Sequence, residues 1–140
     1  MGQSRRWFAI KADVRDPQAA SFVFNAQKTM YGGKSVAVGD TIFVFASENE
    51  GGMGLIARGI VTVCGSVPRT AAARQTPRVS ITVERDRLVR RSLGRSELRP
   101  FRGQSDYAPE VELDFKLYRQ ATNKIVGLSD TTGGFLNGLF

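Results

Sequence analysis

The apolar residues of this chain concentrate in two neighbouring segments, 41–47 and 55–63. Residues 41–47 are mainly β-branched, aromatic and apolar, and residues 55–63 are similar in character. The stretch between them, 48–54, contains three glycines, which allow the chain to reverse its direction. This pattern predicts a β-hairpin. Because both strands are apolar on both faces, we expect them to be buried on both sides in the middle of a sheet or barrel.

Further segments have the pattern of strands. Residues 7–11 are mainly apolar, and residues 124–128 form a short apolar run near the end of the chain. Residues 78–85 and 111–118 alternate between apolar and polar side chains. Such alternation predicts strands that are buried on one face and exposed on the other.

One segment after the first strand carries a helix signal. Asp16 followed by Pro17 is typical of a helix start, with the aspartate as N-cap and the proline in the first turn. We expect this helix to run from Pro17 to about Lys28 or Met30, where a turn with two glycines follows.

The order of these elements predicts the fold class. Ser129 or Asp130 is placed to cap a short C-terminal helix. Five to six mostly antiparallel strands, one helix between strands 1 and 2, and a short C-terminal helix indicate an α+β fold built on a small open β-barrel. Neither a linker nor an internal repeat interrupts the pattern, so we expect residues 1–140 to form a single domain.

Composition excludes several kinds of chemistry. The chain has no histidine, which rules out Ser-His-Asp triads and histidine metal sites, and Cys64 is its single cysteine. We therefore expect no metal, no cofactor and no disulfide framework. The chain has neither a signal peptide nor an apolar run of membrane-spanning length, so we expect a cytoplasmic protein and no membrane partner.

Positive charge is the one unusual feature of the composition. The formal net charge is +7, and residues 69–102 contain ten arginines and no lysine, against Glu84, Asp86 and Glu97. Arginine matches the geometry of phosphate groups and releases condensed counterions from nucleic acids. A nucleic-acid partner fits this distribution. The alternative is a solvated basic surface with no such role.

Several of these segments resemble the PUA-like superfamily, and within it the EVE domain and the related YTH domain. Residues 7–11 match the opening aromatic strand of that family, and a Gly-Asp pair at 39–40 precedes an aliphatic-aromatic strand that ends at Ser47. Residues 54–61 match the family's return strand, and residues 114–128 resemble its closing strands. A Gly-Asp turn before a hydrophobic strand also occurs in ASCH domains of the same superfamily.

The resemblance implies a PUA-like barrel with one small pocket between the first strand, the helix and the central hairpin. Relatives use this pocket to hold a single base, often a modified one, and a flipped base needs an aromatic face and a few hydrogen-bonding groups. The aromatic wall would come from Phe45, Tyr31, Phe24 or Trp7. Trp7 and Phe45 are also natural core residues. YTH cages use two or three tryptophans, and this chain has one. The residues that the resemblance places at the pocket are Trp7, Lys11, Ala12, Asp13, Asn25, Tyr31, Phe45, Ser47 and Glu48.

The favoured function is a non-enzymatic module that binds DNA or RNA. A single base, with modified bases among the candidates, would enter the pocket, and the phosphates would contact Arg85, Arg87, Arg90, Arg91 and Arg95. A second hypothesis is an ASCH-like enzyme acting on RNA or nucleosides, with Lys11 or Lys28 beside Glu48. A third is a protein-interaction module whose pocket is vestigial.

Overall fold

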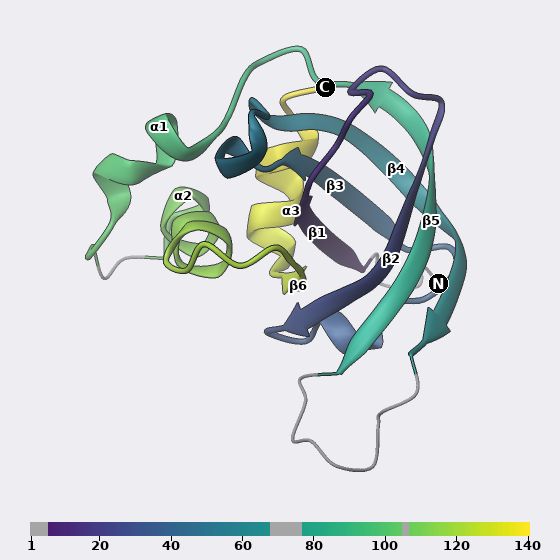
Figure 1. Ribbon diagram of the computed structural model, residues 1–140. Coiled ribbons are helices and arrows are strands. Elements are labelled where there is room, and N and C mark those ends of the chain that lie inside the picture. Colours follow the sequence, from purple (N-terminus) through teal and green to yellow (C-terminus); the bar gives the residue numbers. More distant parts are fainter. Residues whose placement is uncertain (1–5, 68–76, 105–106) are drawn as a thin grey trace, which may run out of the picture.

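Six strands close into a barrel in the computed structural model, which describes residues 6–67, 77–104 and 107–140 (Figure 1). Neighbouring strands follow the order β1-β3-β4-β5-β2-β6, and β6 pairs with β1 to close the ring. The pairs β1–β3 and β2–β6 are parallel, and the other pairs are antiparallel. The strands are β1 (Trp7–Ala12), β2 (Ser21–Met30), β3 (Thr41–Ala46), β4 (Gly54–Ser66), β5 (Arg78–Leu88) and β6 (Lys124–Leu128). The predicted α+β barrel is confirmed, but it is closed where an open one was expected.

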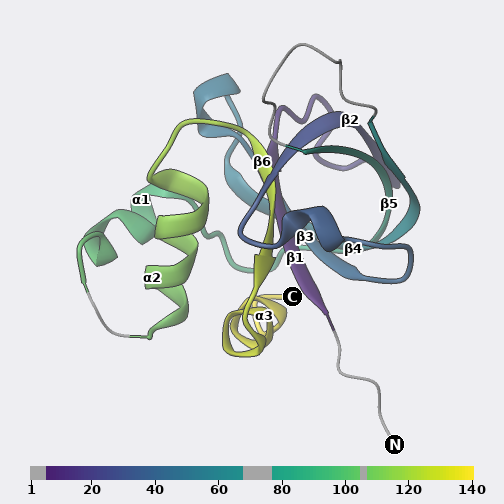
Figure 2. The same ribbon diagram turned by 90° about the horizontal axis from the view of Figure 1, so that it is seen from below.

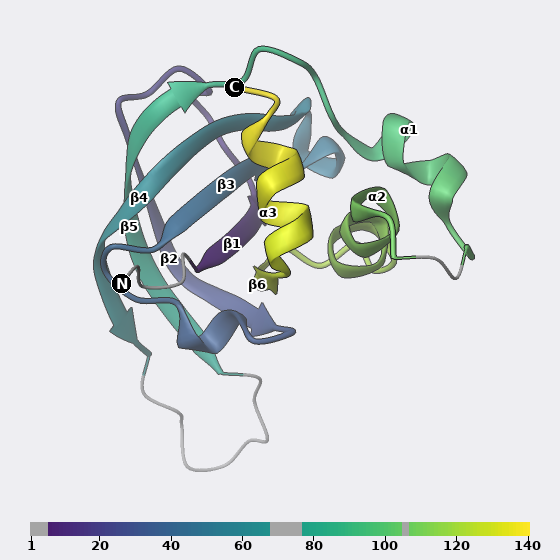
Figure 3. The same cartoon turned by 180° about the vertical axis from the view of Figure 1, so that it is seen from behind.

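The helical segments are short and lie mainly on one side of the barrel. They are η1 (Gly33–Ser35), η2 (Glu48–Glu50), α1 (Arg95–Leu98), η3 (Arg99–Phe101), α2 (Pro109–Leu113), the π-helix η4 (Asp114–Tyr118) and α3 (Asp130–Asn137). Figure 2 shows α1 and α2 together on the side of the barrel where β6 lies. Figure 3 shows α3 lying across the outer surface of the strands. Within the described residues, the structure contains no helix with the length and apolarity needed to cross a bilayer.

Strand β3 separates two hydrophobic cores. Every residue of β3 is buried, as the double-sided apolar pattern predicted. Ile42, Val44 and Ala46 point into the barrel and pack with residues of the other strands. Phe43 and Phe45 point outward and pack under the helices, with partners such as Leu117 and Leu136 from η4 and α3. The barrel is therefore filled inside and covered outside along this strand.

The predicted helix from Pro17 to about Lys28 or Met30 is wrong, because residues 21–30 form β2. The Asp16 carboxylate does accept a hydrogen bond from the Gln18 backbone at 3.0 Å, but the turn ends there. Phe22 and Phe24 are buried in the barrel, whereas Val23 between them is exposed. This alternation has the period of a strand, and aromatic and β-branched residues fit a strand better than a helix. The tertiary need to complete the barrel overrides the local capping signal.

The predicted strand over 111–118 is also wrong, because α2 and η4 occupy this segment. Leu113, Asp114, Leu117 and Tyr118 are buried, a spacing that belongs to one helical face. Pro109 at the start of α2 is the signal that sequence reasoning passed over. The expected C-terminal helix is confirmed as α3, and Ser129 caps it by accepting a hydrogen bond from the Thr132 backbone.

Glu112 joins α2 to α3. Its carboxylate accepts hydrogen bonds from the Ser129 backbone and hydroxyl, from the Thr132 hydroxyl and from the Lys116 ammonium. Lys116 also donates to the Gly127 carbonyl at 2.6 Å, which ties the junction to β6. Burial by itself favours the neutral acid, but these hydrogen bonds outweigh it and lower the pKa of Glu112.

We expect Glu112→Gln to lower the free energy of unfolding at pH 7 by about 1–3 kcal/mol, because charge-assisted hydrogen bonds are lost. The pKa of Glu112 in the folded protein is below the ordinary value of 4.5. The carboxylate therefore contributes fully to stability above pH 4.5, and this contribution is lost as the pH falls through the folded-state pKa. Urea unfolding at pH 7 and at acidic pH measures the difference. Glu110→Gln, on the same helix, is the matched control. An equal loss for the two variants at pH 7 would contradict the assignment.

Candidate functional site

A polar cavity of about 260 Å³ opens where β1 and β3 end. We call it the Lys11 cavity. The Ser47–Asn49 corner follows β3, and the segment after the π-helix η4 forms the opposite wall. The lining residues are Lys11, Ser47, Glu48, Asn49, Arg95, Tyr118, Arg119, Gln120 and Ala121.

Ser47 brings an unused hydroxyl to this cavity. Its side chain is 1 % exposed, and its Oγ has no hydrogen-bond partner among the described residues. The Ser47 backbone is fixed, since its N–H donates to the Ala12 carbonyl at 2.8 Å and its carbonyl accepts from Gly52 at 2.8 Å. An unpaired buried hydroxyl costs free energy, so a ligand that hydrogen-bonds it would recover that cost.

The Glu48 carboxylate is held in one position by groups from distant parts of the chain. It accepts hydrogen bonds from the Tyr118 hydroxyl at 3.1 and 3.3 Å and from the Arg95 backbone at 2.7 Å. A Cβ atom at Gly94 would lie 2.6 Å from Glu48 Oε2, so the glycine leaves room for this carboxylate. Burial and then the neighbouring Glu48 charge raise the pKa of the Tyr118 phenol, so it stays a hydrogen-bond donor.

The π-helix positions Tyr118 at the cavity wall. The Arg119 N–H reaches back to the Asp114 carbonyl at 3.0 Å, five residues earlier, and this widens the helical turn. The buried Asp114 carboxylate is held by two hydrogen bonds from Arg102, each 3.1 Å long. Arg102 also donates to the Tyr118 carbonyl at 3.1 Å, so one guanidinium fixes both ends of η4.

Two buried lysines lie next to each other beneath the cavity. Lys11 and Lys124 are direct partners in the β1–β6 register and are 2 % and 1 % exposed. Lys11 Nζ lies 3.4 Å from the Ala121 carbonyl and 5.1 Å from the centre of the Tyr118 ring, and Lys124 Nζ donates to the Thr122 carbonyl at 3.1 Å. Burial lowers the pKa of Lys11, partly opposed by Glu48. Burial and then the like charge of Lys11 lower the pKa of Lys124 to about 8.

Of the sequence-predicted pocket residues, the structure brings Lys11, Ser47 and Glu48 together in the Lys11 cavity. Arg95, expected at the phosphates, lines the same cavity. Ala12 contributes only the carbonyl that anchors Ser47, because its side chain lies inside the barrel.

The other predicted pocket residues lie elsewhere. Phe45 is fully buried in the core between β3 and the helices. Asp13 and Asn25 line a separate cavity of about 510 Å³ beside the β1–β2 connection. The expected aromatic wall is therefore wrong for this cavity, since neither Phe24, Phe45, Trp7 nor Tyr31 lines it. Phe45 shares the outward face of the sheet with Lys11 but is covered by the helices, and Phe24 points into the barrel. Trp7 and Tyr31 lie at the opposite end of β1.

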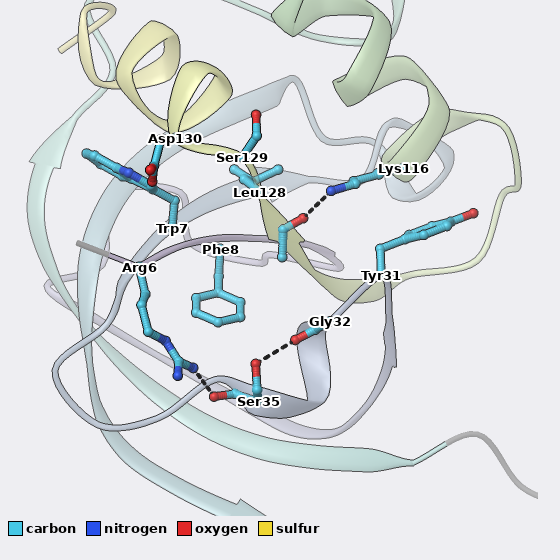
Figure 4. Close-up of a pocket in the computed structure, with 11 residues that line it drawn as sticks. Arg6, Trp7, Phe8, Tyr31, Gly32, Ser35, Lys116, Leu128, Ser129 and Asp130 are labelled. Atoms are coloured by element: carbon cyan, nitrogen blue, oxygen red, sulfur yellow. Dashed lines mark hydrogen bonds between the residues drawn. The ribbon is translucent and has the colours of Figure 1, made fainter. Parts of the chain in front are cut away.

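Trp7 and Tyr31 line a second cavity, of about 450 Å³, at the opposite end of β1 (Figure 4). We call it the Tyr31 cavity. Figure 4 shows Trp7 and Tyr31 at opposite sides of it, with Phe8 and Leu128 between them. Trp7 packs on Phe43 with ring centres 5.9 Å apart, so it also belongs to the core beneath the helices.

The predicted phosphate-binding arginines are spread along β5 and the connection after it. Arg87, Arg90, Arg91 and Arg95 are exposed, whereas Arg85 is half-buried and donates to the Ala19 carbonyl at 2.8 Å. The backbones of Arg90 and Arg91 are fixed by hydrogen bonds to the Leu139 carbonyl. The connection then leads to Arg95 at the Lys11 cavity.

Sequence reasoning missed Tyr118 and Arg119 as cavity residues. Tyr118 ends the predicted strand 111–118, on the face expected to be exposed, and Arg119 follows it. Only the helical spacing after Pro109 could have placed Tyr118 on the buried face beside Leu117. In the described part of the chain, acidic and cysteine side chains form no cluster of three that could hold a metal ion.

We expect Lys124→Met to raise the free energy of unfolding at pH 7, because the wild-type protein buries an ammonium group beside another one. The pKa of Lys124 is about 8 in the folded protein and 10.5 ordinarily. Between these two pH values the unfolded chain therefore keeps a proton on Lys124 that the folded protein has released. The wild-type protein therefore gains stability as the pH rises from 8 to 10.5, and the advantage of the variant shrinks. Urea unfolding across this range tests the effect, with exposed Lys34→Met as control. A pH-independent difference would contradict it.

Comparison with known proteins shows which solved structures share this fold. No protein-family model matches the chain, and no curated protein sequence does. Solved structures do match. Human THYN1 in complex with DNA containing 5-methylcytosine has a TM-score of 0.63 and 11 % identity, covering 96 % of this chain and 96 % of that chain. A protein from Pseudomonas putida has a TM-score of 0.64 and 14 % identity, covering 95 % and 98 %.

An ASCH protein from Zymomonas mobilis, solved as a point mutant, is also similar. Its TM-score is 0.53 at 9 % identity, and the match covers 96 % of this chain and 99 % of that chain. The THYN1 domain is also described as a DUF55 domain. At such low identities, the likeness concerns the course of the backbone over nearly the whole chain. The chain therefore shares its barrel fold with the DUF55 domain of human THYN1 and with the ASCH protein, which is the fold that the resemblance to the PUA-like superfamily implied.

Proposed function

We propose that this protein is a nucleic-acid-binding module that holds one base in the Lys11 cavity, with modified bases among its candidate ligands. The observation that carries the proposal is that Ser47 lines the cavity and its buried hydroxyl has no hydrogen-bond partner among the described residues. Ligand pockets for drug-sized molecules measure roughly 300–1,000 Å³. A cavity of about 260 Å³ suits a smaller ligand, such as one base.

The chemistry of the cavity suits the edge of a base. Lys11 is a donor, the fixed Glu48 carboxylate is an acceptor, and the Ser47 hydroxyl can act as either. A base edge presents donors and acceptors side by side, and a flipped base is recognised through them. The Tyr118 ring is the aromatic group of the lining, so recognition here rests on hydrogen bonds more than on an aromatic cage.

Charge and fold support a nucleic acid as the source of that base. The cavity is lined by three cationic residues, Lys11, Arg95 and Arg119, and by one carboxylate, Glu48, and the whole chain carries a formal net charge of +7. The similar fold of THYN1 has been solved with DNA containing 5-methylcytosine. We assign the exposed Arg87, Arg90, Arg91 and Arg95, with Arg85, to phosphate contacts along the β5–α1 connection.

Ser47→Ala tests the base contact. We expect it to weaken binding of the preferred base about fivefold, since one hydrogen bond contributes about 1 kcal/mol. Because the hydroxyl has no partner in the described structure, the variant should be at least as stable as the wild-type protein. Titration of short labelled oligonucleotides with matched unmodified and methylated bases, at two salt concentrations, measures both affinity and base preference. Exposed Ser66→Ala is the control, and unchanged base preference in Ser47→Ala would refute the pocket.

Arg90→Ala combined with Arg91→Ala tests the phosphate contacts in the same titration. We expect weaker binding of every sequence. For single strands, the slope of log affinity against log salt concentration should become less steep by about 1.4, since each lost phosphate contact accounts for about 0.7. Base preference should persist. A variant that loses base preference and keeps its salt slope would assign these arginines to the base instead.

A second candidate function is an ASCH-like enzyme that acts on nucleosides or RNA. The lowered pKa of Lys11, beside Glu48 and Tyr118, is the observation that favours it, because a neutral amine can act as a base or nucleophile. Incubation with acylated nucleosides and with RNA tests it. Turnover that Lys11→Met abolishes would establish the enzyme, and no turnover with either substrate would exclude it. The third hypothesis, a vestigial pocket, loses support because the cavity is open.

A further inference from the structure

An exposed aromatic pair is linked to the Lys11 cavity through Arg119. The Phe115 and Tyr31 rings are 5.5 Å apart at their centres, and their residues are 47 % and 40 % exposed. Arg119 lies 5.7 Å from the centre of the Phe115 ring and also lines the Lys11 cavity. These residues form a continuous surface from one cavity to the other, which we call the Arg119–Phe115–Tyr31 track.

The backbone holds Tyr31 in an unfavourable conformation that displays its ring. Its φ is 52°, in the left-handed region that non-glycine residues seldom adopt. The Tyr31 carbonyl is fixed by a hydrogen bond of 3.1 Å from Gly127 of β6, and a Cβ atom on Gly127 would come within 2.9 Å of that oxygen. Strained backbone of this kind tends to occur at functional sites. An exposed ring in such a position is therefore a candidate contact.

The track continues into the Tyr31 cavity, which Tyr31 and Lys116 border (Figure 4). The two cavities lie at opposite ends of β1, where Trp7 lines one and Lys11 the other. At about 3.3 Å per residue along a strand, these two residues are about 13 Å apart. Lys116 already pairs with Glu112 at 2.8 Å, and Arg6 pairs with Asp40 at 3.2 Å. Of the cations along the track and the Tyr31 cavity, Arg119 is therefore the one that best suits a phosphate.

We propose that the Arg119–Phe115–Tyr31 track binds the unpaired nucleotides that flank the base held in the Lys11 cavity. Arg119 engages the phosphate next to that base, and the following bases stack on the exposed faces of Phe115 and Tyr31. Aromatic rings with interleaved cations are how proteins hold single strands without reading their sequence. The stacking faces of bases in a duplex are covered by their neighbours, so the track selects a single strand or a strand opened around the flipped base. This inference rests on the proposed base pocket.

The test compares oligonucleotides whose flanking bases are present or absent. Single strands of five nucleotides carry a central adenine, cytosine, guanine, thymine or 5-methylcytosine, and in the matched set the flanking nucleotides are abasic, which keeps the phosphates and removes the stacking. We expect natural flanks to strengthen binding about tenfold, or about 1.4 kcal/mol, because each stacked base adds to the affinity. Fluorescence anisotropy at fixed salt measures both sets.

Phe115→Ala and Tyr31→Gly should each reduce the advantage of natural flanks severalfold, while the corresponding mononucleotides bind as before. Glycine at position 31 removes the ring and eases the left-handed backbone, so the variant keeps its fold. Met53→Ala, which removes an exposed apolar side chain before β4, is the matched control and should retain the full advantage. Arg119→Ala should weaken binding of natural and abasic strands alike.

The two proposals fail in different ways. Equal binding of natural and abasic flanks, with the central base still discriminated, overturns the track and leaves the pocket. Loss of the advantage in Met53→Ala to the same extent as in Phe115→Ala also overturns it. Absence of any central-base preference, together with a flank advantage that Phe115→Ala removes, refutes the pocket and establishes the track as a single-strand site by itself.

Discussion

Burial of both faces of β1 and β3 is the constraint on which the rest of the structure depends. These parallel strands carry one apolar set into the barrel and another outward, so the outward set must be covered. Phe43 and Phe45 meet the helical segments for this reason, and α2, η4 and α3 pack where they do because that surface would otherwise face water. The covering helices then form the walls of both cavities.

The Lys11 cavity arises where this double burial ends. Lys11 is the last outward-facing residue of β1, and it lies beneath the helical cover with Lys124 opposite it. Two buried ammonium groups and an unpaired Ser47 hydroxyl are costly in a folded protein. Such costs are typical of sites in which a ligand completes the polar contacts. The Glu48 carboxylate, held by Tyr118 and Arg95, gives the cavity a fixed acceptor.

One short helical segment connects the two cavities. The π-helix η4 directs Tyr118 toward the Lys11 cavity, while Lys116 borders the Tyr31 cavity and Phe115 is exposed between them. The extra residue in the π-turn rotates the end of the segment relative to its start. Asp114 and Arg102 hold this geometry from the buried side. The same element can thus position a pocket residue and present an exposed aromatic ring.

The sequence by itself determined the barrel class, the β3–β4 hairpin, the burial of both faces of β3 and the C-terminal helix. The prediction that β4 is also buried on both faces is wrong for its second half, because Ile60 and Val63 are exposed. The elements follow from local periodicity. The meeting of Lys11, Ser47 and Glu48 at one cavity was implied by the resemblance to the PUA-like superfamily, and in the structure it follows from the parallel pairing of β1 with β3. Only the tertiary structure decided that residues 21–30 form a strand and residues 109–118 a helix, because barrel closure and core packing outweigh a capping signal or a short alternation. It also decided that Tyr118 enters the cavity and that Trp7, Tyr31 and Phe45 do not. Contacts between residues far apart in the chain decide which end and which face of a strand a helix covers. Local spacing carries no information about these long-range contacts.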